Sequence, residues 1–306
     1  MNYSKKALPN PAKPIELFGF YLFHLKKILT TSIRLRIQDP FGYKQNKVYD
    51  ELLKQRDTKK NIPCFVLANG PSLNKLDPKK IRTFCSEHDA EVFCVNYFPN
   101  SEFARIAGYD HWVISDPYFF KVDQDVPLPK REILSSTFGN VKKHLRQCVY
   151  APSKEVAKVK NKMNVPVIGF NDIEISTIFS DSINPVKPRS YISMSAYKAL
   201  AIACYLGFSP IYICGFDNSY ITNLGCDREN RIFRKNEHFD ENAYKSSSPI
   251  QLLSYKYRSV ADELISNSRL FSDLEKFNEH LILNLDVDSL TDAFRKDDSL
   301  DIYVQG

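Results

Sequence analysis

The chain has 306 residues, of which 43% are hydrophobic and 25% charged, and lysine plus arginine exceed aspartate plus glutamate by six. This balance is typical of a globular protein with a sizeable core, and it excludes disorder, collagen and coiled coil as the main architecture. Glycine is scarce, at 10 residues, and no glycines form G-x-G-x-x-G or G-x-x-x-x-G-K. A dinucleotide-type Rossmann loop and a Walker loop are therefore excluded. The small positive surplus suits a phosphate or an anionic lipid, and no nucleic-acid partner is expected.

Residues 15–37 form a segment rich in large apolar and basic residues, IELFGFYLFHLKKILTTSIRLRI. His24, Lys26 and Lys27 interrupt its apolar run, so it falls short of the roughly 20 residues that a transmembrane helix needs. Basic and aromatic residues on one helix are typical of a segment on an anionic membrane surface. The alternative is a helix packed on the protein's own core or on a sister subunit of a homo-oligomer. Residues 1–45 are therefore expected to form a basic amphipathic segment with one of these two roles.

The seven cysteines are odd in number, form no C-x-x-C pair and mostly lie in apolar runs. Such cysteines are typical of buried, reduced thiols, because disulfides form in oxidising compartments. No secretory signal is recognised in the first residues. We therefore expect a cytoplasmic protein, peripheral on the inner face of the cytoplasmic membrane if residues 15–37 bind lipid.

The main predicted elements, in chain order, are short apolar runs typical of buried strands and one apolar helix. The strong runs are 62–68, 91–95, 111–115 and 210–214, and the weaker ones are 147–151, 165–168 and 280–285. Residues 193–206 have helical composition, with Ser193 or Ser195 as the candidate N-cap and Gly207 in the position of a left-handed C-cap. Residues 73–85 suggest a connection and a helix, 250–279 a helix, and 40–61 a linker or solvated helix. Strands alternating with helices predict an α/β fold: one parallel sheet with helices on both faces.

Residues 221–248 form a long charged stretch that contains three arginines and a histidine. A stretch of this length without predicted elements is usually functional or disordered. We expect a lid over a ligand site. The lid would follow a nucleotide-binding α/β domain over residues 60–220, and residues 249–306 would be a C-terminal helical part that completes the core.

Polar residues follow the ends of the predicted strands. They are Asn69, Gly70 and Ser72, then Asn96, then Asp116, then Gly215 and Asp217. The carboxyl ends of parallel strands meet at one edge of a sheet, where ligands bind. Amide and hydroxyl groups suit sugar hydroxyls, a base edge or phosphate oxygens, and the start of the helix near Ser195 favours an anion. Ordinary turn chemistry explains each of these residues singly, but together they predict a ligand site.

Four segments of the chain match motifs of a known family. Residues 66–73 read VLANGPSL, 93–98 read FCVNYF, 195–208 join a serine to an alanine-rich helix ending in Leu-Gly-Phe, and 211–217 read IYICGFD. In order and rough spacing they resemble the GNGPSL, RCNQF, TSG…A.AIALGY and IYLSGID motifs of glycosyltransferase family 42. These are bacterial sialyltransferases that use CMP-sialic acid. The resemblance covers about residues 62–220, and the wider MptE-like superfamily shares the N-G-P-S and G-x-D elements.

The resemblance implies a Rossmann-like, GT-A-like fold and a role for each matching residue. Asn69 and Ser72 would contact the nucleotide and its phosphate, Asn96 the donor sugar, Ser195 the donor carboxylate, and Gly215, Phe216 and Asp217 the cytidine and ribose. The family's phosphate-binding tyrosine aligns with Ser219, and the adjacent Tyr220 is the candidate for its role. Gly70 allows the backbone to approach a ligand closely. The sequence departs from the family at Asp116, which stands where the family has asparagine and would repel the carboxylate of sialic acid. It also has Ile192 where the family has an arginine.

The family's chemistry needs a base for the acceptor hydroxyl and help for the departing CMP. His238 is the candidate base, because an unperturbed imidazole titrates near neutral pH. Arg228, Arg231 and Arg234 are candidates for neutralising the phosphate. His111, at the start of a strand, is interpreted as structural.

No metal or other cofactor is expected, because the family works without one. Two D-x-D pairs, Asp123 with Asp125 and Asp286 with Asp288, are the candidates for a divalent ion, which prefers oxygen ligands. Neither pair follows one of the strong early strands.

The leading hypothesis is an inverting, metal-independent glycosyltransferase that transfers sialic acid, or a related nonulosonic acid, from a CMP-activated donor to a surface glycan or a lipid-linked acceptor. One alternative is a pterin diphosphokinase of the MptE-like type. The other is a non-catalytic accessory protein that binds a nucleotide.

Overall fold

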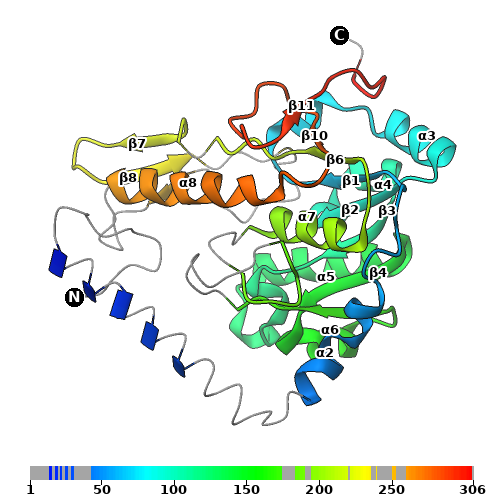
Figure 1. The fold of residues 1–306 in the computed structure, drawn as a ribbon, viewed down its shortest axis with the longest axis horizontal. Coiled ribbons are helices and arrows are strands. Elements are labelled where there is room, and N and C mark those ends of the chain that lie inside the picture. The colour runs from blue at the N-terminus through cyan, green and yellow to red at the C-terminus, as the bar shows by residue number, and fades with distance from the viewer. Residues whose placement is uncertain are drawn as a thin grey trace.

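A computed structural model of the chain describes residues 43–173, 183–189, 194–219, 221–235, 239, 250–252 and 260–304, together with five residue pairs between 14 and 30. Eight parallel strands form its central sheet, in the order β11-β10-β6-β1-β2-β3-β4-β5 (Figure 1). The strands are β1 (Cys64–Leu67), β2 (Glu91–Val95), β3 (Tyr109–Val113), β4 (Leu145–Pro152), β5 (Val167–Phe170), β6 (Ile211–Cys214), β10 (Ile282–Asn284) and β11 (Arg295–Lys296).

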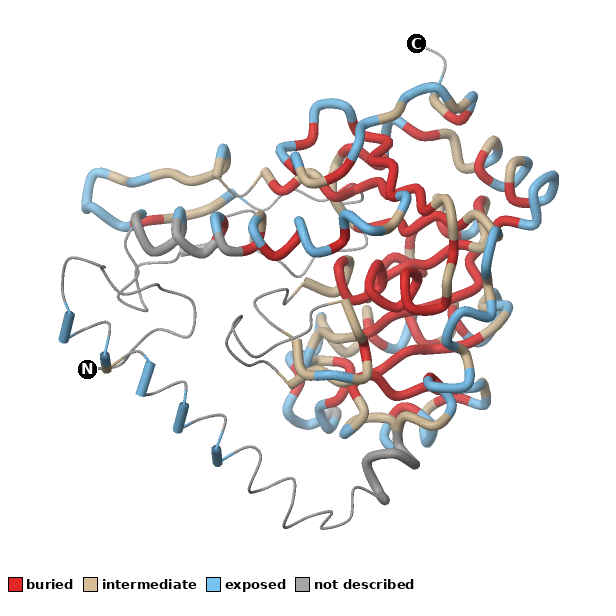
Figure 2. The backbone as a smooth tube through the Cα atoms, in the orientation of Figure 1, coloured by how far each residue is buried: buried red, intermediate tan, exposed pale blue. Residues whose placement is uncertain are grey.

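Helices cover both faces of this sheet, as the alternation of strands and helices predicts. Side chains alternate along each strand, so Phe65 and Leu67 of β1 face one core cluster while Cys64 and Val66 face the other. Figure 2 shows the buried residues concentrated in the sheet and in the helix sides against it. The first cluster includes residues of α3 (Pro78–His88), α4 (Glu102–Ala107), α5 (Leu128–His144) and α6 (Val156–Lys162); the second includes residues of α2 (Tyr43–Lys54), α7 (Ser195–Leu206) and α8 (Val260–Leu274).

The strand order changes direction at β1. Strands β1 to β5 follow one another outward on one side, whereas β6 and β10 lie on the other side of β1. The connection after β1 leads to β2 on one side, and the connection through α7 leads to β6 on the other side. A crevice therefore opens beyond the carboxyl ends of β1 and β6. Open α/β sheets bind their ligands at such a switch point.

Several elements differ from the sequence-based predictions. Helices α4, α5 and α6 and strand β11 were not predicted, whereas the connection and helix predicted over 73–85 are present as a 3-10 turn over Pro71–Lys75 followed by α3. The prediction of a linker or solvated helix over 40–61 is only partly right. The segment contains α2, and Leu52 of this helix is fully buried. In the charged 221–248 stretch, the described residues form the hairpin β7 (Leu224–Cys226) and β8 (Ile232–Lys235). With β9 (Ile250–Leu252) they make a small antiparallel sheet.

Helix α7 lies against the second face of the sheet, and ten of its twelve residues are buried. Gly207 ends it in the left-handed region with φ +92°, which confirms the predicted C-cap. The predicted serine N-cap is wrong for Ser195: the cap position is Met194, and the Ser195 hydroxyl accepts a hydrogen bond from Asn96 instead. Ser193 lies outside the described residues.

The cysteines and the basic segment give two further results. All seven cysteines are free, and six are buried, with Cys226 exposed. Within the part of the chain that the structure describes, no helix has the length and hydrophobicity to cross a membrane.

Candidate functional site

A cavity of about 450 Å³ opens at the switch point, beyond the carboxyl ends of β1, β2, β3 and β6. It brings together five chain segments that are far apart in sequence, and residues from the hairpin side. Its lining consists of residues 68–71, 95–96, 115–117, 194–196 and 215–219, with Asn223, Arg234 and Lys235 from the hairpin side. The structure therefore brings together most of the residues that the sequence singled out.

The ends of β1 and β6 approach each other closely at two glycines. Gly70 donates its backbone N–H to the Gly215 carbonyl oxygen at 3.0 Å. A Cβ atom at Gly70 would lie 2.5 Å from that same oxygen and closer still to the Asp217 carboxylate. Gly215 has φ +76°, and a Cβ there would lie 2.7 Å from the Ala68 carbonyl oxygen. Both positions thus require glycine, and the predicted role of Gly70 in close approach includes approach to the protein's own chain.

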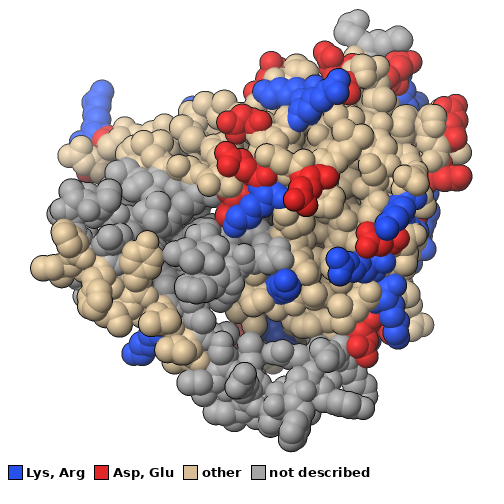
Figure 3. Space-filling view, in the orientation of Figure 1, with Lys and Arg blue, Asp and Glu red and all other residues tan. Residues whose placement is uncertain are grey.

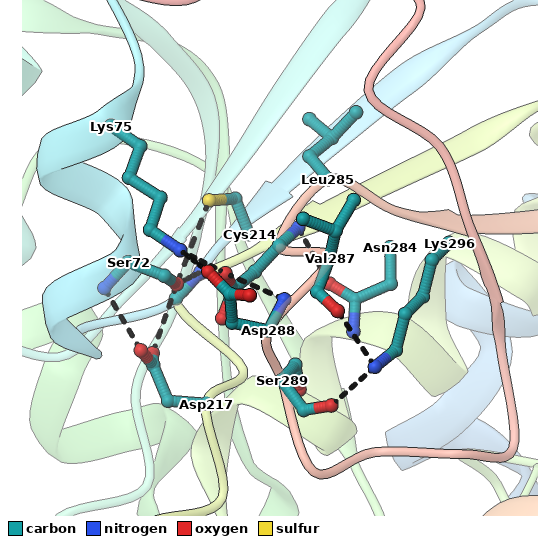
Figure 4. Close-up of polar contacts among 12 residues, drawn as sticks. Ser72, Lys75, Cys214, Asp217, Asn284, Leu285, Val287, Asp288, Ser289 and Lys296 are labelled. Atoms are coloured by element: carbon teal, nitrogen blue, oxygen red, sulfur yellow. Dashed lines mark hydrogen bonds and ion pairs between the residues drawn. The ribbon is translucent and has the colours of Figure 1, made fainter.

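Ser72 and Asp217 hold these two strand ends together (Figure 4). The Ser72 backbone N–H donates to Asp217 Oδ1 at 2.9 Å, and its hydroxyl donates to Asp217 Oδ2 at 3.0 Å. That hydroxyl also accepts the Gly215 N–H at 3.1 Å. Burial raises the pKa of Asp217, and the two bonds from Ser72 oppose this rise. Ser72 is 4% exposed and is not among the cavity-lining residues, so its side chain binds Asp217 and Gly215 rather than facing the cavity.

Asn96 joins the ends of β2 and β3 to the start of α7. It has φ +45°, in the left-handed region that asparagine tolerates. Its Oδ1 accepts backbone N–H groups of Ser115 at 3.1 Å and Asp116 at 3.3 Å, and its Nδ2 donates to Ser195 Oγ at 2.8 Å. The Ser115 and Ser195 hydroxyls also bind each other. Asn96 and Ser195 are therefore both in the cavity wall and bonded to each other.

Asp116 lies in the wall of the cavity, at the carboxyl end of β3. Its Oδ2 accepts the Tyr97 hydroxyl at 2.8 Å, and its Oδ1 accepts the Tyr118 N–H at 2.9 Å. The Lys130 ammonium lies over the Tyr97 ring, 4.1 Å from the centroid. Burial lowers the pKa of Lys130, and the nearby Asp116 carboxylate opposes this lowering. The carboxylate that departs from the family pattern is thus bound by two donors, with a cation close by.

Phe216 and Asn218 form the floor beside α7. The Phe216 ring packs edge-on against Tyr197, and its carbonyl oxygen accepts the hydroxyls of Ser289 and Thr291. Asn218 donates to the hydroxyls of Tyr197 and Thr291. The loop after β10 therefore supports the same strand end that lines the cavity, a contact that the sequence alone did not indicate.

Three features of the cavity wall can bind an uncharged or anionic ligand. Asn69 lines the cavity, and its buried Oδ1 has no hydrogen-bond partner among the described residues. The first turn of α7 lines the cavity, and N–H groups at a helix start have no partner within the helix, which favours an anion. Arg234 and Lys235 contribute positive charge from β8. Ser115, Asn218, Ser219, Asn223 and Lys235 line the cavity but were not predicted site residues.

The predicted lid residues have separate positions. Arg231 pairs with Asp227 at 2.6 Å and Glu229 at 2.8 Å within the hairpin turn, and Arg228 is exposed. Neither lines the cavity, whereas Arg234 does. Tyr220 and His238 lie outside the described residues, so their proposed roles stay predictions.

His111 does not line the cavity but lies in the core of the protein. It is 1% exposed and bonds Glu91 Oε2 at 2.6 Å, and Lys59 also binds Glu91. Burial opposes ionisation of Glu91, but the bonds from His111 and Lys59 outweigh it and lower the pKa of Glu91 to about 2. This environment agrees with a structural role for His111.

Neither D-x-D pair gathers a third acidic, histidine or cysteine side chain in the described chain, and no group of three or more such residues that could hold a metal is found there. Asp123 and Asp125 begin and end a short 3-10 helix. Lys75 Nζ lies 2.6 Å from the Asp286 carboxylate and 2.7 Å from the Asp288 carboxylate. Figure 4 shows Lys75 reaching toward Asp288. These two hydrogen bonds raise the pKa of Lys75. A lysine ammonium thus already neutralises the second pair.

Comparison with known proteins gave few matches. No protein-family model matches the chain, and no curated protein matches it. Among solved structures, it is similar to the MAf glycosyltransferase from Magnetospirillum magneticum AMB-1, with 12% sequence identity and a TM-score of 0.43. The alignment covers 90% of this chain and 43% of that one, so the chain spans less than half the length of that structure.

Proposed function

We propose that this protein is an inverting glycosyltransferase that transfers sialic acid, or a related nonulosonic acid, from a CMP-activated donor without a metal. The acceptor would be a surface glycan or a lipid-linked glycan. One observation carries the proposal: the four segments that resemble family 42 motifs all reach one cavity at the switch point of the sheet. Residues 69–70, 96, 195–196 and 215–217 line it together.

The charged side chains of the cavity wall are Arg234 and Lys235 and the carboxylates Asp116 and Asp217, whose oxygens already accept hydrogen bonds from the protein's own donors. A CMP-activated nonulosonic acid carries a phosphate and a carboxylate. The cavity has two separate sources of positive potential: the start of α7 near Ser195, and the pair Arg234 and Lys235 on β8. In the proposed complex, Ser195 and Asn96 face the sugar and its carboxylate, and the cations on β8 face the phosphate.

The nucleoside would lie where β1 and β6 end. In the proposed complex, Asn69 would accept a hydrogen bond from an amino or hydroxyl group of the nucleoside, and Gly70, Gly215 and Phe216 line the cavity beside it. Asp217 also lines the cavity, but both its oxygens accept bonds from Ser72. We therefore assign Ser72 to holding Asp217 in place rather than to contacting the phosphate.

In the proposed reaction, the bond between the anomeric carbon and the phosphate oxygen breaks, and CMP leaves with the electron pair. The acceptor hydroxyl attacks the opposite face of the sugar, which inverts the anomeric centre. Its proton passes to a base, for which His238 remains the candidate. Arg234 and Lys235 of β8 would stabilise the charge on the departing phosphate.

Isothermal titration with CMP and UDP, each with and without Mg²⁺, tests the donor class. We expect CMP to bind equally well with and without the ion, and UDP to bind much more weakly in both cases. Binding of UDP only in the presence of Mg²⁺ would contradict the proposal, as would the absence of CMP binding. A pterin diphosphate formed from ATP and detected by mass spectrometry would favour the diphosphokinase alternative.

The base is tested separately with His238→Ala. We expect this variant to keep the CMP affinity of the wild-type protein while losing sugar transfer, because the base acts on the acceptor and not on the nucleotide. Turnover at the wild-type rate would remove His238 from this role.

A further inference from the structure

Among the described residues of the basic segment, six large hydrophobic side chains are exposed: Tyr21, at 48%, and five apolar ones. Ile15 is 83% exposed, Phe18 67%, Leu22 48%, Leu25 47% and Leu29 51%. Figure 2 shows the described residues of this segment as exposed almost throughout. Isolated exposed apolar residues are common, but five in one short segment indicate an interaction surface.

These five residues share one helical face. All described residues between 14 and 30 are helical, and the Thr30 hydroxyl donates to the Lys26 carbonyl oxygen one turn earlier, at 2.8 Å. The apolar positions 15, 18, 22, 25 and 29 follow one another at intervals of three and four, which is the repeat of a single helical stripe. We call these five residues the exposed stripe.

The charge of the chain is concentrated around the exposed stripe. Residues 1–37 contain seven lysines and arginines and one acidic residue, Glu16, a net charge of +6, which equals the surplus of the whole chain. The remaining 269 positions carry 35 basic and 35 acidic residues. In Figure 3, the basic and acidic side chains of the described body are interspersed on the face shown. Positive charge and exposed hydrophobic surface therefore occur together in this one segment.

We propose that the exposed stripe docks the protein on an anionic lipid bilayer. The five apolar side chains would enter the boundary between headgroups and acyl chains, and Lys26 and the other basic residues of 1–37 would bind lipid phosphates. Phe18 is one of the residue types that typically form the apolar face of an interfacial helix. The proposal does not rest on the proposed sugar transfer, although it would bring the cavity to lipid-linked substrates.

The charge of residues 1–37 and the length of the exposed stripe favour lipid, rather than a second copy of the chain, as the partner of the stripe. Two copies would bring two segments of net charge +6 together, whereas an anionic bilayer offers the complementary charge. The exposed stripe covers 15 positions, about two heptads, and a coiled coil is expected only over about three or four.

Co-sedimentation of the full chain with vesicles tests the docking. We expect binding to vesicles of phosphatidylglycerol with phosphatidylcholine, weaker binding to phosphatidylcholine alone, and a decrease as NaCl rises. Leu22→Glu with Leu25→Glu should reduce binding to the anionic vesicles at least about tenfold. Lys26→Gln should reduce it about fivefold, the effect expected of one basic residue near an anionic surface.

The matched control is Leu128→Glu, the same change at a residue that is 69% exposed at the start of α5. It should leave vesicle binding unchanged. Sedimentation velocity without lipid gives the second measurement. A wild-type dimer that the double variant converts to monomer would overturn the proposal in favour of self-association, as would double-variant binding equal to that of the wild-type protein. Absence of wild-type binding to anionic vesicles would also overturn it.

Discussion

Ser72 and Asp217, 145 positions apart, are joined by two hydrogen bonds that use both carboxylate oxygens. The bonds connect the turn after β1 to the residues after β6, the two strands on either side of the switch point. A pair in this position sets the distance between the two walls of the cavity.

Ser72→Ala and Asp217→Asn should be strongly non-additive. Each single change breaks the same bond network at a buried site, so each should lower the free energy of unfolding by about 1–3 kcal/mol. The free energy of unfolding of the double variant should fall by less than the sum of the two single losses, with an interaction energy of about 1 kcal/mol or more. Urea unfolding of the four proteins measures this, and additive losses would show that the two side chains act independently.

Gly70→Ala should destabilise the protein and abolish nucleotide binding. The new Cβ would lie 2.5 Å from the Gly215 carbonyl oxygen, so the ends of β1 and β6 would have to separate. The matched control is Gly139→Ala in α5, where a Cβ meets nothing within 4 Å. The control should stabilise the protein by about 0.5–1 kcal/mol, because alanine favours the helix. Thermal unfolding and CMP titration of both variants check the contrast; equal effects would exclude the steric explanation.

Lys75→Met should lower the free energy of unfolding far more than Lys80→Met does. Removing Lys75 leaves Asp286, 3% exposed, without its cation, and we expect a loss of about 1–3 kcal/mol. Lys80 binds Asp301, whose side chain is 94% exposed, and this loss should stay below about 1 kcal/mol. Denaturant unfolding measures both. If Mg²⁺ stabilised the Lys75→Met protein but not the wild type, the pair Asp286 and Asp288 would be a latent metal site that the lysine blocks.

The pH dependence of stability should contain a contribution from Glu91. Its pKa is lowered from 4.5 to about 2 in the folded protein, so the folded state favours the carboxylate. The resulting stabilisation, about 3 kcal/mol, is present above pH 4.5 and is lost as the pH falls toward 2. Glu91→Gln should flatten this part of the acid unfolding profile, whereas Glu102→Gln, at a side chain that is 73% exposed, should not. An unchanged profile in Glu91→Gln would show that other carboxylates cause acid unfolding.

Arg234→Gln should weaken CMP binding about tenfold or more, since a bond between two charged groups is worth more than a neutral one. Arg228→Gln provides the control, because Arg228 is exposed and does not line the cavity. Titration of CMP and cytidine separates phosphate binding from nucleoside binding: the effect of Arg234→Gln should disappear with cytidine. Equal weakening for both ligands would place Arg234 at the nucleoside instead.

The sequence by itself determined the parallel α/β class, most strands and the C-cap at Gly207, because these depend on local patterns. Buried parallel strands are short continuous apolar runs, and a helix end favours glycine in the left-handed region. It also grouped the polar residues after β1, β2, β3 and β6, since the carboxyl ends of parallel strands share one edge. Helix α5 was missed because its sequence is polar and contains Ser135, Ser136 and Gly139; packing of Leu134, Phe138 and Val141 stabilises it.

Only the tertiary structure decided which of the grouped residues face the cavity. A motif gives a side chain's type and position but not its partner, and the partners named below lie 99 or more positions apart. The Ser72 hydroxyl binds Asp217 and Gly215, the Asp286 and Asp288 pair binds Lys75, and Asn96 binds Ser195 across 99 positions. Asn69 Oδ1, by contrast, meets no partner among the described residues. Because hydrogen bonds act over about 3 Å, these outcomes depend on how the strand ends pack and not on the order of residues along the chain.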